Sequence, residues 1–483
     1  MGKFYVTTSI PYVNADPHIG FALEAIQADV LARYHRQKGE DIFFLTGADE
    51  HGVKIIRAAK AAGKTPQSFT DGVTKKFKDL KKALNLSWSD FIRTSDKKRH
   101  WPGAQKLWLN LYDAGKLYKK SYKGLYCIGH EAFITEKDLV NGQCRDHQQE
   151  PEIIEEENWF FKLSDYTKEI KARIESGELR IAPESRRNEI LSLLKEGLED
   201  ISFSRPRQDL DWGIPVPNDP KHTMYVWCDA LSNYISALGY GQESDKRQTT
   251  SDKFRRYWPA DVQVIGKDIL RFHAAIWPGM LLAAKLLLPK TIFVHGFITV
   301  GGEKMSKTVG NVIDPFEVVK KYGSDALRYY LLREIPSGED GDFTYEKFEE
   351  RYNADLAKGL GNLVARVLTL AQKNKIKAIK NKVFDTNINK IEKQIEQLIK
   401  EFKFNDALSV LWRLIALGNK YIDKKKPWAL KPESKEFKEI IGSLLFLISH
   451  IGVLLSPFLT ETSEKISGQL KNRKISILFP QLK

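Results

Sequence analysis

Apolar residues in the first hundred positions alternate between short unbroken runs and stretches in which they recur every three or four residues. The unbroken runs, Lys3–Thr8 and Asp41–Thr46, are rich in aromatic and β-branched side chains and predict buried strands. The periodic stretches, Ile19–Gln37 and Lys54–Ala62, predict helices. Strands that alternate with helices in this way indicate a parallel sheet and an α/β fold.

The strand pattern returns far downstream, after a segment of different character. Val262–Ile265 and Thr291–Val294 predict two further short buried strands. The segment Leu117–Pro217 between the two parts is rich in Cys, His, Gly and acidic runs, and we interpret it as a domain inserted into the sheet domain. After Pro315 the pattern is almost wholly helical, with a Lys- and Asn-rich connection expected over Asn374–Lys390. The chain therefore predicts an interrupted α/β domain followed by a helical region.

Composition restricts the class of protein but does not identify it. The 483 residues suggest about three domains. A hydrophobic content of 42% and a charged content of 29% exclude wholesale disorder. The net charge of +14 fits either a polyanionic partner, such as nucleic acid or a nucleotide, or a surplus of surface lysine. Charge alone does not separate these two interpretations.

The cysteine count and the apolar segments bear on the compartment. Three cysteines exclude a disulfide scaffold and fit a reducing environment. Residues Met1–Tyr12 enter a strand pattern at once, without a signal or transit peptide. The longest apolar stretches, such as Leu281–Leu288 and Leu444–Ser456, fall short of the roughly 20 residues that span a bilayer. We therefore expect a cytoplasmic protein with no membrane partner.

The first candidate for chemistry is Pro11–Gly20, with the sequence PYVNADPHIG, between a predicted strand and a predicted helix. In open α/β sheets that position binds ligands, with phosphates near the helix N-terminus. His18 could donate a hydrogen bond to a phosphate oxygen as charge develops, and Gly20 would let a flat base approach the backbone. Taken alone, the segment is better explained as a Pro-rich turn with a solvent-exposed histidine.

The second candidate is Gly301–Thr308, with the sequence GGEKMSKT, which follows another predicted strand. Lys304 and Lys307 lie three residues apart on a loop with a Gly-Gly hinge. Two such lysines can close on a triphosphate and neutralise a departing pyrophosphate. The alternative is a solvated basic loop.

The inserted segment contains two pairs of metal-ligand residues. Cys127 and His130 form the first pair, and Cys144 and His147 form the second, thirteen residues further on. This spacing fits a tetrahedral structural zinc site, although a knuckle without metal would keep the same residues. The third cysteine, Cys228, is expected to pack in a pocket wall.

The two candidate segments together resemble the HIGH and KMSKS signatures of class I aminoacyl-tRNA synthetases. More of the chain, from residue 4 to about residue 430, resembles the methionyl-tRNA synthetase family in particular. The segments that carry this resemblance are Pro11–Gly20, Thr46–Gly52, Asp209–Pro217, Tyr225–Tyr234, Ile265–His273 and His295–Asn311.

The resemblance implies an α/β fold with a Rossmann-like parallel-sheet catalytic domain, an inserted connective domain of the zinc-knuckle type and a C-terminal all-α anticodon-binding bundle. The implied limits are 1–116 and 223–314 for the two catalytic halves, 117–222 for the insert, 315–360 for a stem-contact region and 361–483 for the bundle. An appended tRNA-binding and dimerising module, which some members have, is not expected here, so the expected state is a monomer.

The implied activity is that of a methionine–tRNA ligase, with methionine, ATP carrying Mg²⁺, and methionine tRNA as partners. The implied catalytic residues are His18, Lys304 and Lys307. The implied ATP-binding residues are Pro11, His18, Gly20, Gly266, Asp268, His295, Lys304 and Lys307. The implied methionine-binding residues are Ile10, Tyr12, Asp49, Trp227, Ala230, Tyr234, Ile269 and His273. The implied anticodon contacts are Asn362, Arg366 and Trp428.

Residue chemistry agrees with several of these roles. A thioether is well held by aromatic and aliphatic walls, and Asp49 can pair with an α-ammonium group. Glu24 is expected near the ribose or the ammonium. The zinc ligands would be Cys127, His130, Cys144 and His147, with His130 where the family more often has cysteine.

One position departs from the family signature, which normally ends in a second histidine. Here Phe21 follows Gly20, and a phenyl ring cannot hydrogen-bond to phosphate. Losing one donor to a developing charge costs about 3 kcal/mol. Either other donors, such as His51 and the loop lysines, replace it, or adenylate formation is slow.

Three other functions compete with this interpretation. A class I synthetase for valine, isoleucine or leucine would need a large editing insert, for which Leu117–Pro217 leaves little room. A small-molecule nucleotidyltransferase would lack the helical C-terminal region. A non-catalytic RNA-binding paralogue would have no reason to keep the lysine loop.

Overall fold

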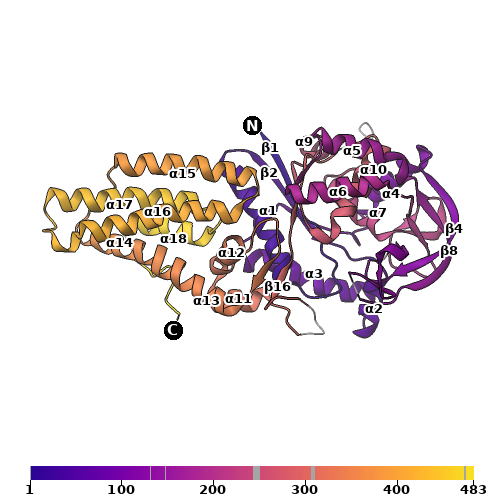
Figure 1. Cartoon of the computed structure of the whole chain (residues 1–483), viewed down its shortest axis with the longest axis horizontal. Coiled ribbons are helices and arrows are strands. Elements are labelled where there is room, and N and C mark those ends of the chain that lie inside the picture. Colours follow the sequence, from indigo (N-terminus) through magenta and orange to yellow (C-terminus); the bar gives the residue numbers. More distant parts are fainter. Residues whose placement is uncertain are drawn as a thin grey trace. The chain divides into compact units, whose positions relative to one another are not determined.

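The structure is a computed structural model and describes residues 2–130, 132–146, 148–242, 251–305, 310–472 and 475–482 (Figure 1). The chain divides into two compact units, each built from several stretches of sequence. The first unit consists of Met1–Pro17, Gly39–Asp79 and Trp88–Val294. The second unit consists of His18–Lys38, Leu80–Ser87 and His295–Lys483.

A six-stranded sheet with the order β3-β2-β1-β14-β15-β9 forms the centre of the first unit. Its strands are β1 (Lys3–Thr7), β2 (Asp41–Ala48), β3 (Asp90–Arg93), β9 (Arg180–Ala182), β14 (Val262–Gly266) and β15 (Thr291–His295). β1 pairs in parallel with β2 and β14, β2 with β3, and β15 with β9. The predicted strands and the parallel sheet are confirmed.

Helices and turns of the first unit supply the apolar groups that pack on this sheet. The helices are α2 (Val53–Ala61), α3 (Pro66–Ala83), α4 (Trp101–Asp113), α5 (Thr167–Glu175), α6 (Glu184–Glu196), α7 (Val226–Leu231), α8 (Asn233–Ser236), α9 (Asp252–Tyr257) and α10 (Trp277–Ala283). Short 3-10 or π-helical turns cover Glu136–Asp138, Leu163–Tyr166, Lys267–Ile269 and Phe272–Ile276. The core joins Tyr5 and Phe43 of the sheet to Trp108 of α4 and Trp277 of α10.

Antiparallel strands form most of the segment predicted to be an insert. Its strands are β4 (Leu117–Cys127), β5 (Ala132–Ile134), β6 (Leu139–Val140), β7 (Gln143–Cys144), β8 (Glu152–Phe161), β10 (Ile201–Ser202), β11 (Ser204–Pro206), β12 (Pro215–Val216) and β13 (Asp219–Met224). β4 and β8 pair over most of their length, with Lys123 opposite Glu155. The side chains of Lys123 and Glu155 approach to 3.5 Å.

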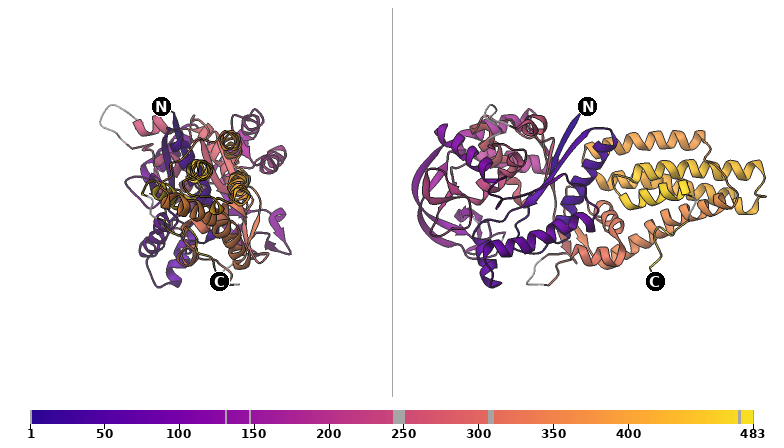
Figure 2. Two further views of the ribbon diagram at one scale, coloured as in Figure 1. Left: turned by 90° about the vertical axis from the view of Figure 1, so that its left-hand side faces the viewer. Right: turned by 180° about the vertical axis from the view of Figure 1, so that it is seen from behind.

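The second unit is mainly helical. Its helices are α1 (Ile19–Gln37), α11 (Pro315–Tyr322), α12 (Ser324–Arg333), α13 (Tyr345–Arg351), α14 (Asn362–Lys373), α15 (Lys382–Lys400), α16 (Phe404–Lys425), α17 (Lys435–Leu455) and α18 (Thr460–Asn472). A π-helical stretch covers Tyr352–Gly361, and a 3-10 turn covers Pro427–Ala429. A small sheet joins β16 (Ile298–Val300) to β17 (Glu303–Lys304) and β18 (Gly341–Phe343). Helices α14 to α18 run alongside one another as a bundle (Figures 1 and 2).

The bounds of α1 agree with the sequence prediction, but the connection expected over Asn374–Lys390 is wrong in its second half. Helix α15 begins at Lys382 because Asn381 caps it, with its Oδ1 accepting from the backbone N–H of Val383 at 3.0 Å. From Phe384 onward, buried apolar residues recur at helical spacing. The high density of lysine and asparagine on the exposed positions hid this periodicity.

Helix α17 corrects a second expectation, that no apolar segment reaches the length of a membrane span. The 21 residues of Lys435–Leu455 are long and apolar enough by composition, and 61% of the most apolar stretch is buried inside the protein. The helix packs against α14, α16 and α18 in the bundle. Burial against neighbouring helices accounts for its apolar character.

A buried ion pair ties α1 to other parts of the second unit. Nη1 of Arg328, on α12, lies 2.8 Å from Oδ2 of Asp29, on α1, and both side chains are fully buried. Arg328 also donates to the backbone carbonyls of Leu84, Pro457 and Phe458 at 3.1, 3.1 and 2.7 Å. Burial alone would raise the pKa of Asp29, but the facing guanidinium holds it below its ordinary value.

Candidate active site

His18 caps the N-terminus of α1 with its own side chain. Its backbone is extended, and Nδ1 accepts a hydrogen bond from the backbone N–H of Gly20 at 3.0 Å. Burial lowers the pKa of His18, so the imidazole is neutral at neutral pH. Because Nδ1 is an acceptor, the single ring proton resides on Nε2. His18 therefore offers a hydrogen-bond donor beside the N-terminus of a helix, where anions are favoured.

The absence of a side chain at Gly20 is a requirement of this geometry. A Cβ atom there would lie 2.8 Å from Cε1 and 2.9 Å from Nδ1 of His18. Contacts this close force the ring out of its capping position. The sequence prediction is that glycine at position 20 lets a base approach the backbone. The structure adds a second reason for glycine there, the space that the His18 ring needs. Phe21, the next residue, is largely buried, with 9% of its surface exposed.

The lysine loop begins in the small sheet of the second unit. Lys304 ends β17 and is exposed, with its Nζ 5.4 Å from the ring centroid of Phe297. Gly301 and Gly302 have φ values of 62° and 83°, which favour glycine, so the hinge inferred from the sequence is a real turn. Lys307 lies outside the described residues.

His295 and Glu24 form a buried pair in the second unit. Nε2 of His295 lies 3.0 Å from Oε2 of Glu24, and Nδ1 lies 2.7 Å from the carbonyl oxygen of Gly296. Both ring nitrogens of His295 thus face oxygen atoms. The sequence prediction places His295 near the adenosine and Glu24 near the ribose or the ammonium, and in the structure the two side chains form a pair.

The other residues predicted to bind ATP belong to the first unit. Gly266 ends the central strand β14, and Asp268 is exposed in the turn that follows it. The carbonyl of Pro11 accepts the backbone N–H of Asp49 at 2.9 Å. These positions at the carboxyl ends of parallel strands are where α/β sheets bind ligands.

Aromatic and histidine side chains predicted to hold methionine come together in the first unit. The hydroxyl of Tyr234 donates to Nε2 of His273 at 2.7 Å, and Nδ1 of His273 donates to the carbonyl of Ile269 at 3.0 Å. The indole of Trp227 stacks on Phe272 with ring centroids 3.7 Å apart and planes 9° apart. Sequence reasoning missed Phe272, although it stands beside His273 in the same matched segment.

Tyr12 and Asp49 lie side by side as a parallel β-bridge. The side chain of Asp49 is 5% exposed, and the hydroxyl of Tyr12 donates to the carbonyl of His51 at 2.7 Å. Ala230, on α7, is buried, and Ile10 is partly buried against the same core. The predicted methionine residues therefore fall on the sheet edge, on α7 and α8, and on the turn after β14.

Hydrogen-bonded polar side chains connect α7 to the segment that follows β2. Sequence reasoning did not identify this connection. Nδ1 of His51 lies 2.6 Å from Oδ2 of Asp229, and Nε2 of His100 lies 2.7 Å from Oδ1 of the same carboxylate. Burial alone would raise the pKa of Asp229, but the two imidazoles hold it below its ordinary value. His51, suggested as a replacement phosphate donor, thus directs Nδ1 to a buried carboxylate.

Three of the four predicted zinc ligands converge. The ligand atoms of Cys127, His130 and Cys144 all lie within 4.8 Å of one another. Nε2 of His130 lies 3.0 Å from Oδ2 of Asp146, a contact that leaves Nδ1 for a metal. Two thiols and one imidazole in this arrangement fit Zn²⁺. His147 lies outside the described residues.

The residues predicted to contact an anticodon lie on the helical bundle. The guanidinium carbon of Arg366 lies 5.1 Å from the ring centroid of Trp428, and the side chain donates to Asp423 at 2.7 Å. Trp428 is 53% exposed, and Asn362 is exposed one helical turn before Arg366 on α14. An exposed indole beside a fixed guanidinium suits base stacking.

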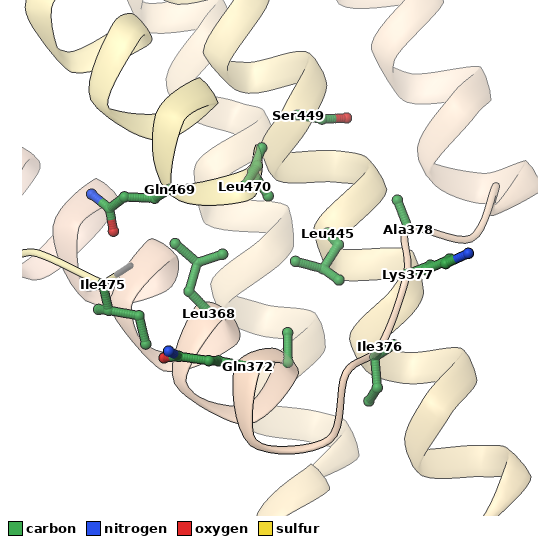
Figure 3. Close-up of a pocket in the computed structure, with 11 residues that line it drawn as sticks. Leu368, Gln372, Ile376, Lys377, Ala378, Leu445, Ser449, Gln469, Leu470 and Ile475 are labelled. Carbon is green, nitrogen blue, oxygen red and sulfur yellow. The ribbon is translucent and has the colours of Figure 1, made fainter. Parts of the chain in front are cut away.

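The bundle also contains a cavity of about 250 Å³, which the predicted anticodon residues do not line (Figure 3). Leu368 and Leu445 provide apolar walls from α14 and α17. The side-chain amide of Gln469 is already engaged with Ser476, at 3.1 Å in each of two hydrogen bonds. The cavity is therefore separate from the predicted sites.

Comparisons with known proteins cover nearly the whole chain. A family model described as tRNA synthetases class I (M) matches residues 4–150 and 135–368. A model described as the anticodon-binding domain of tRNA ligase matches residues 381–482. The methionine–tRNA ligase of Caldanaerobacter subterraneus is 44% identical over 480 residues, which cover 97% of this chain and 74% of that protein. The enzyme of the same name from Brucella suis is 42% identical over 480 residues, with coverages of 96% and 91%.

A solved structure gives the same result. The Mycobacterium tuberculosis methionyl-tRNA synthetase in complex with methionyl-adenylate superposes with a TM-score of 0.91 at 36% identity. The match covers 100% of this chain and 99% of that one.

Proposed function

Since the chain belongs to the methionine–tRNA ligase family of class I tRNA synthetases, we propose that it joins methionine to its tRNA with the residues described above. In the first step a methionine carboxylate oxygen attacks the α-phosphorus of ATP, and the bond to pyrophosphate breaks. In the second step a terminal ribose hydroxyl of the tRNA attacks the adenylate carbonyl, and AMP leaves. Three cysteines, all free in the structure, support a reducing, cytoplasmic location.

Methionine recognition is assigned to the first unit. The carboxylate of Asp49 pairs with the α-ammonium group, because it is buried at the sheet edge and charge-assisted hydrogen bonds are strong there. Trp227 and Tyr234 supply aromatic walls for the polarizable thioether. The hydrogen bond from Tyr234 fixes the ring orientation of His273.

Phosphate recognition is assigned to His18, Lys304 and Lys307. The proton on Nε2 of His18 donates to an α-phosphate oxygen as negative charge develops. The two lysines neutralise the departing pyrophosphate, and the Gly-Gly turn lets their loop close. Mg²⁺ bound with ATP neutralises phosphate charge in this kind of reaction.

Recognition of tRNA is assigned to the bundle. Trp428 stacks on an unstacked base, while Arg366 and Asn362 hydrogen-bond to base edges.

We assign the domain limits as predicted: 1–116 and 223–314 for the catalytic halves, 117–222 for the insert, 315–360 for the stem-contact region and 361–483 for the bundle. A monomer is the expected state.

The insert is assigned a structural zinc site. Cys127, His130 and Cys144 would hold the ion, with His147 as the fourth ligand expected from the sequence. Zinc in such a site supplies folding free energy to a small segment with little apolar core. The core around these ligands consists of Ile134 with Leu125 and Leu139 packed against it.

The observation that carries the proposal is the placement in one unit of the buried carboxylate of Asp49 and of the aromatic side chains of Trp227 and Tyr234, which both contact His273. The test is ATP–pyrophosphate exchange without tRNA, measured with methionine, leucine, isoleucine and valine in turn. We expect exchange with methionine alone, and loss of exchange in Asp49→Ala. No exchange with any amino acid from folded protein would favour a non-catalytic RNA-binding function, and exchange with another amino acid would reassign the substrate.

A further inference from the structure

Four buried polar side chains of the first unit form a continuous hydrogen-bonded chain. It runs from Oγ of Ser236 to Nδ1 of His100 at 2.8 Å, from Nε2 of His100 to Asp229 at 2.7 Å, and from Asp229 to Nδ1 of His51 at 2.6 Å. The side chains of His51, Asp229 and His100 are 3%, 1% and 0% exposed. We call this set the Asp229 chain.

The two ends of the Asp229 chain are attached to opposite parts of the proposed methionine pocket. Asp229 lies on α7 between Trp227 and Ala230, and Ser236 lies on α8 two residues after Tyr234. At the other end, the backbone carbonyl of His51 accepts the hydroxyl of Tyr12 at 2.7 Å. The chain therefore connects the helices that carry the aromatic wall to the segment that carries Tyr12 and Asp49.

Proton positions along the chain follow from the chemistry of its members. An ionised carboxylate only accepts, so Asp229 receives one N–H from His51 and one from His100. On the other side of its ring, Nδ1 of His100 lies 2.8 Å from Oγ of Ser236. The single carboxylate of Asp229 therefore holds both imidazoles and joins the two parts of the proposed pocket.

Packing alone does not require such a chain. Buried ion pairs contribute little net stability compared with apolar side chains of the same size, because desolvation offsets their attraction. Their attested value is to specify one arrangement among several. Here the specified arrangement is the separation between α7 and the Asp49–His51 segment.

We propose that Asp229 is a positioning residue for the amino acid, a proposal that rests on the proposed function. Through His51, Asp229 fixes the Tyr12 side chain opposite the Trp227 wall. Asp229 thereby sets the affinity for methionine. Asp229 itself contacts neither substrate. ATP affinity does not depend on this connection.

The first test compares Asp229→Asn with the wild-type enzyme in methionine-dependent pyrophosphate exchange. An amide offers one acceptor and one donor, so one imidazole must change its protonated nitrogen or lose its partner. We expect the KM for methionine to rise about tenfold, the effect of one lost hydrogen bond to a charged group. The KM for ATP should change less than about twofold, and calorimetric titration with methionine alone should show the same weakening.

A matched control is available in the same unit. Partly exposed Asp219 lies 2.9 Å from Nδ1 of buried His222 on β13, in a histidine–aspartate pair to which no part of the proposed pocket is assigned. Asp219→Asn should leave the KM for methionine within about twofold of wild type, because it removes a similar hydrogen bond elsewhere. Equal rises of the methionine KM in both variants would show a general loss of packing and overturn the proposal.

A double-mutant cycle tests the connection to Tyr12. Tyr12→Phe removes the hydroxyl that binds the carbonyl of His51, so its effect on methionine KM should largely disappear in the Asp229→Asn background. Additive effects would overturn the proposal. If Asp229→Asn does not fold, His100→Gln takes its place in the cycle. Absence of exchange in folded wild-type protein would instead refute the proposed function, whereas methionine binding would still test the role of Asp229.

Discussion

The backbone N–H of Gly20 donates to Nδ1 of His18 at 3.0 Å, so the imidazole fills the space in which a side chain on Gly20 would lie. One contact therefore fixes the capping of α1, the position of the ring and the nitrogen that carries the proton. The glycine and the histidine of the motif are a single structural unit, because neither keeps its geometry without the other.

We expect Gly20→Ala to slow adenylate formation by about 100-fold, the value of one donor to a developing charge. The new Cβ would lie 2.8 Å from the ring of His18 and displace it. Loss of the His18 cap costs about 1 kcal/mol, and the helix preference of alanine over glycine, up to about 1 kcal/mol, offsets it, so the melting temperature should change little. Single-turnover adenylate formation and thermal unfolding measure the two effects.

Gly72→Ala is the matched control for this variant. Gly72 lies within α3, and a Cβ there would meet no atom within 4 Å. It should gain the same helical preference without any change in adenylate formation. A Gly20→Ala enzyme as fast as this control would show that the position of His18 is not critical.

His18→Asn should separate capping from phosphate binding. Asparagine is a good N-cap, so stability at pH 8 should stay close to wild type while adenylate formation falls by about 100-fold. Because burial lowers the folded pKa of His18, the unfolded chain takes up its proton first as pH falls below about 6.5. The unfolding free energy of the wild type should therefore fall relative to that of the variant as the pH is lowered from 7 to 5. Urea titration measures both free energies. A constant difference would contradict the buried neutral imidazole.

Cys144→Ser should release zinc and loosen the insert. Its thiol is one of three convergent ligands, and structural zinc sites contribute folding free energy directly. Elemental analysis should give about one zinc per wild-type chain and less in the variant. Proteolysis should become faster within the insert, while methionine binding is retained. Cys228→Ser is the control, because the thiol of Cys228 is buried and does not belong to this cluster. The Cys228→Ser protein should keep the zinc ion. Zinc-free wild-type protein purified without chelator would refute the site.

Trp428→Ala should impair aminoacylation of tRNA by about 10- to 100-fold, the value of one stacked base. Pyrophosphate exchange without tRNA should stay unchanged, because the indole is exposed on the bundle. Stability should change little for the same reason. Val383→Ala, at a 63% exposed apolar position on α15, is a control for general surface effects. Equal losses in both assays would show that Trp428 supports the fold instead.

Regular elements were accessible from the sequence because their signals are local. Helix α1 begins and ends where its periodicity does, at Ile19 and Gln37. The start of α15 was missed because its exposed lysines and asparagines masked a buried stripe that begins at Phe384. Local composition misleads where a helix buries only one narrow face.

Site residues divided in a similar way. Trp227, Tyr234 and His273 stand within matched segments, and the structure places them together. His100 stands outside every such segment, and only the fold brings it to Asp229. Contacts between residues far apart in sequence, each of an ordinary type, leave no local pattern to detect.

The buried guanidinium of Arg328 limits how this protein can be shortened. Two of its three carbonyl acceptors, those of Pro457 and Phe458, come from the turn between α17 and α18. In a minimal catalytic fragment that ends before this turn, Arg328 would lose two of its three carbonyl acceptors while it still faces Asp29, on the helix that His18 caps. Excision of the bundle would therefore need a compensating replacement of Arg328, and recombination between relatives should exchange α1, α12 and the α17–α18 turn as one block.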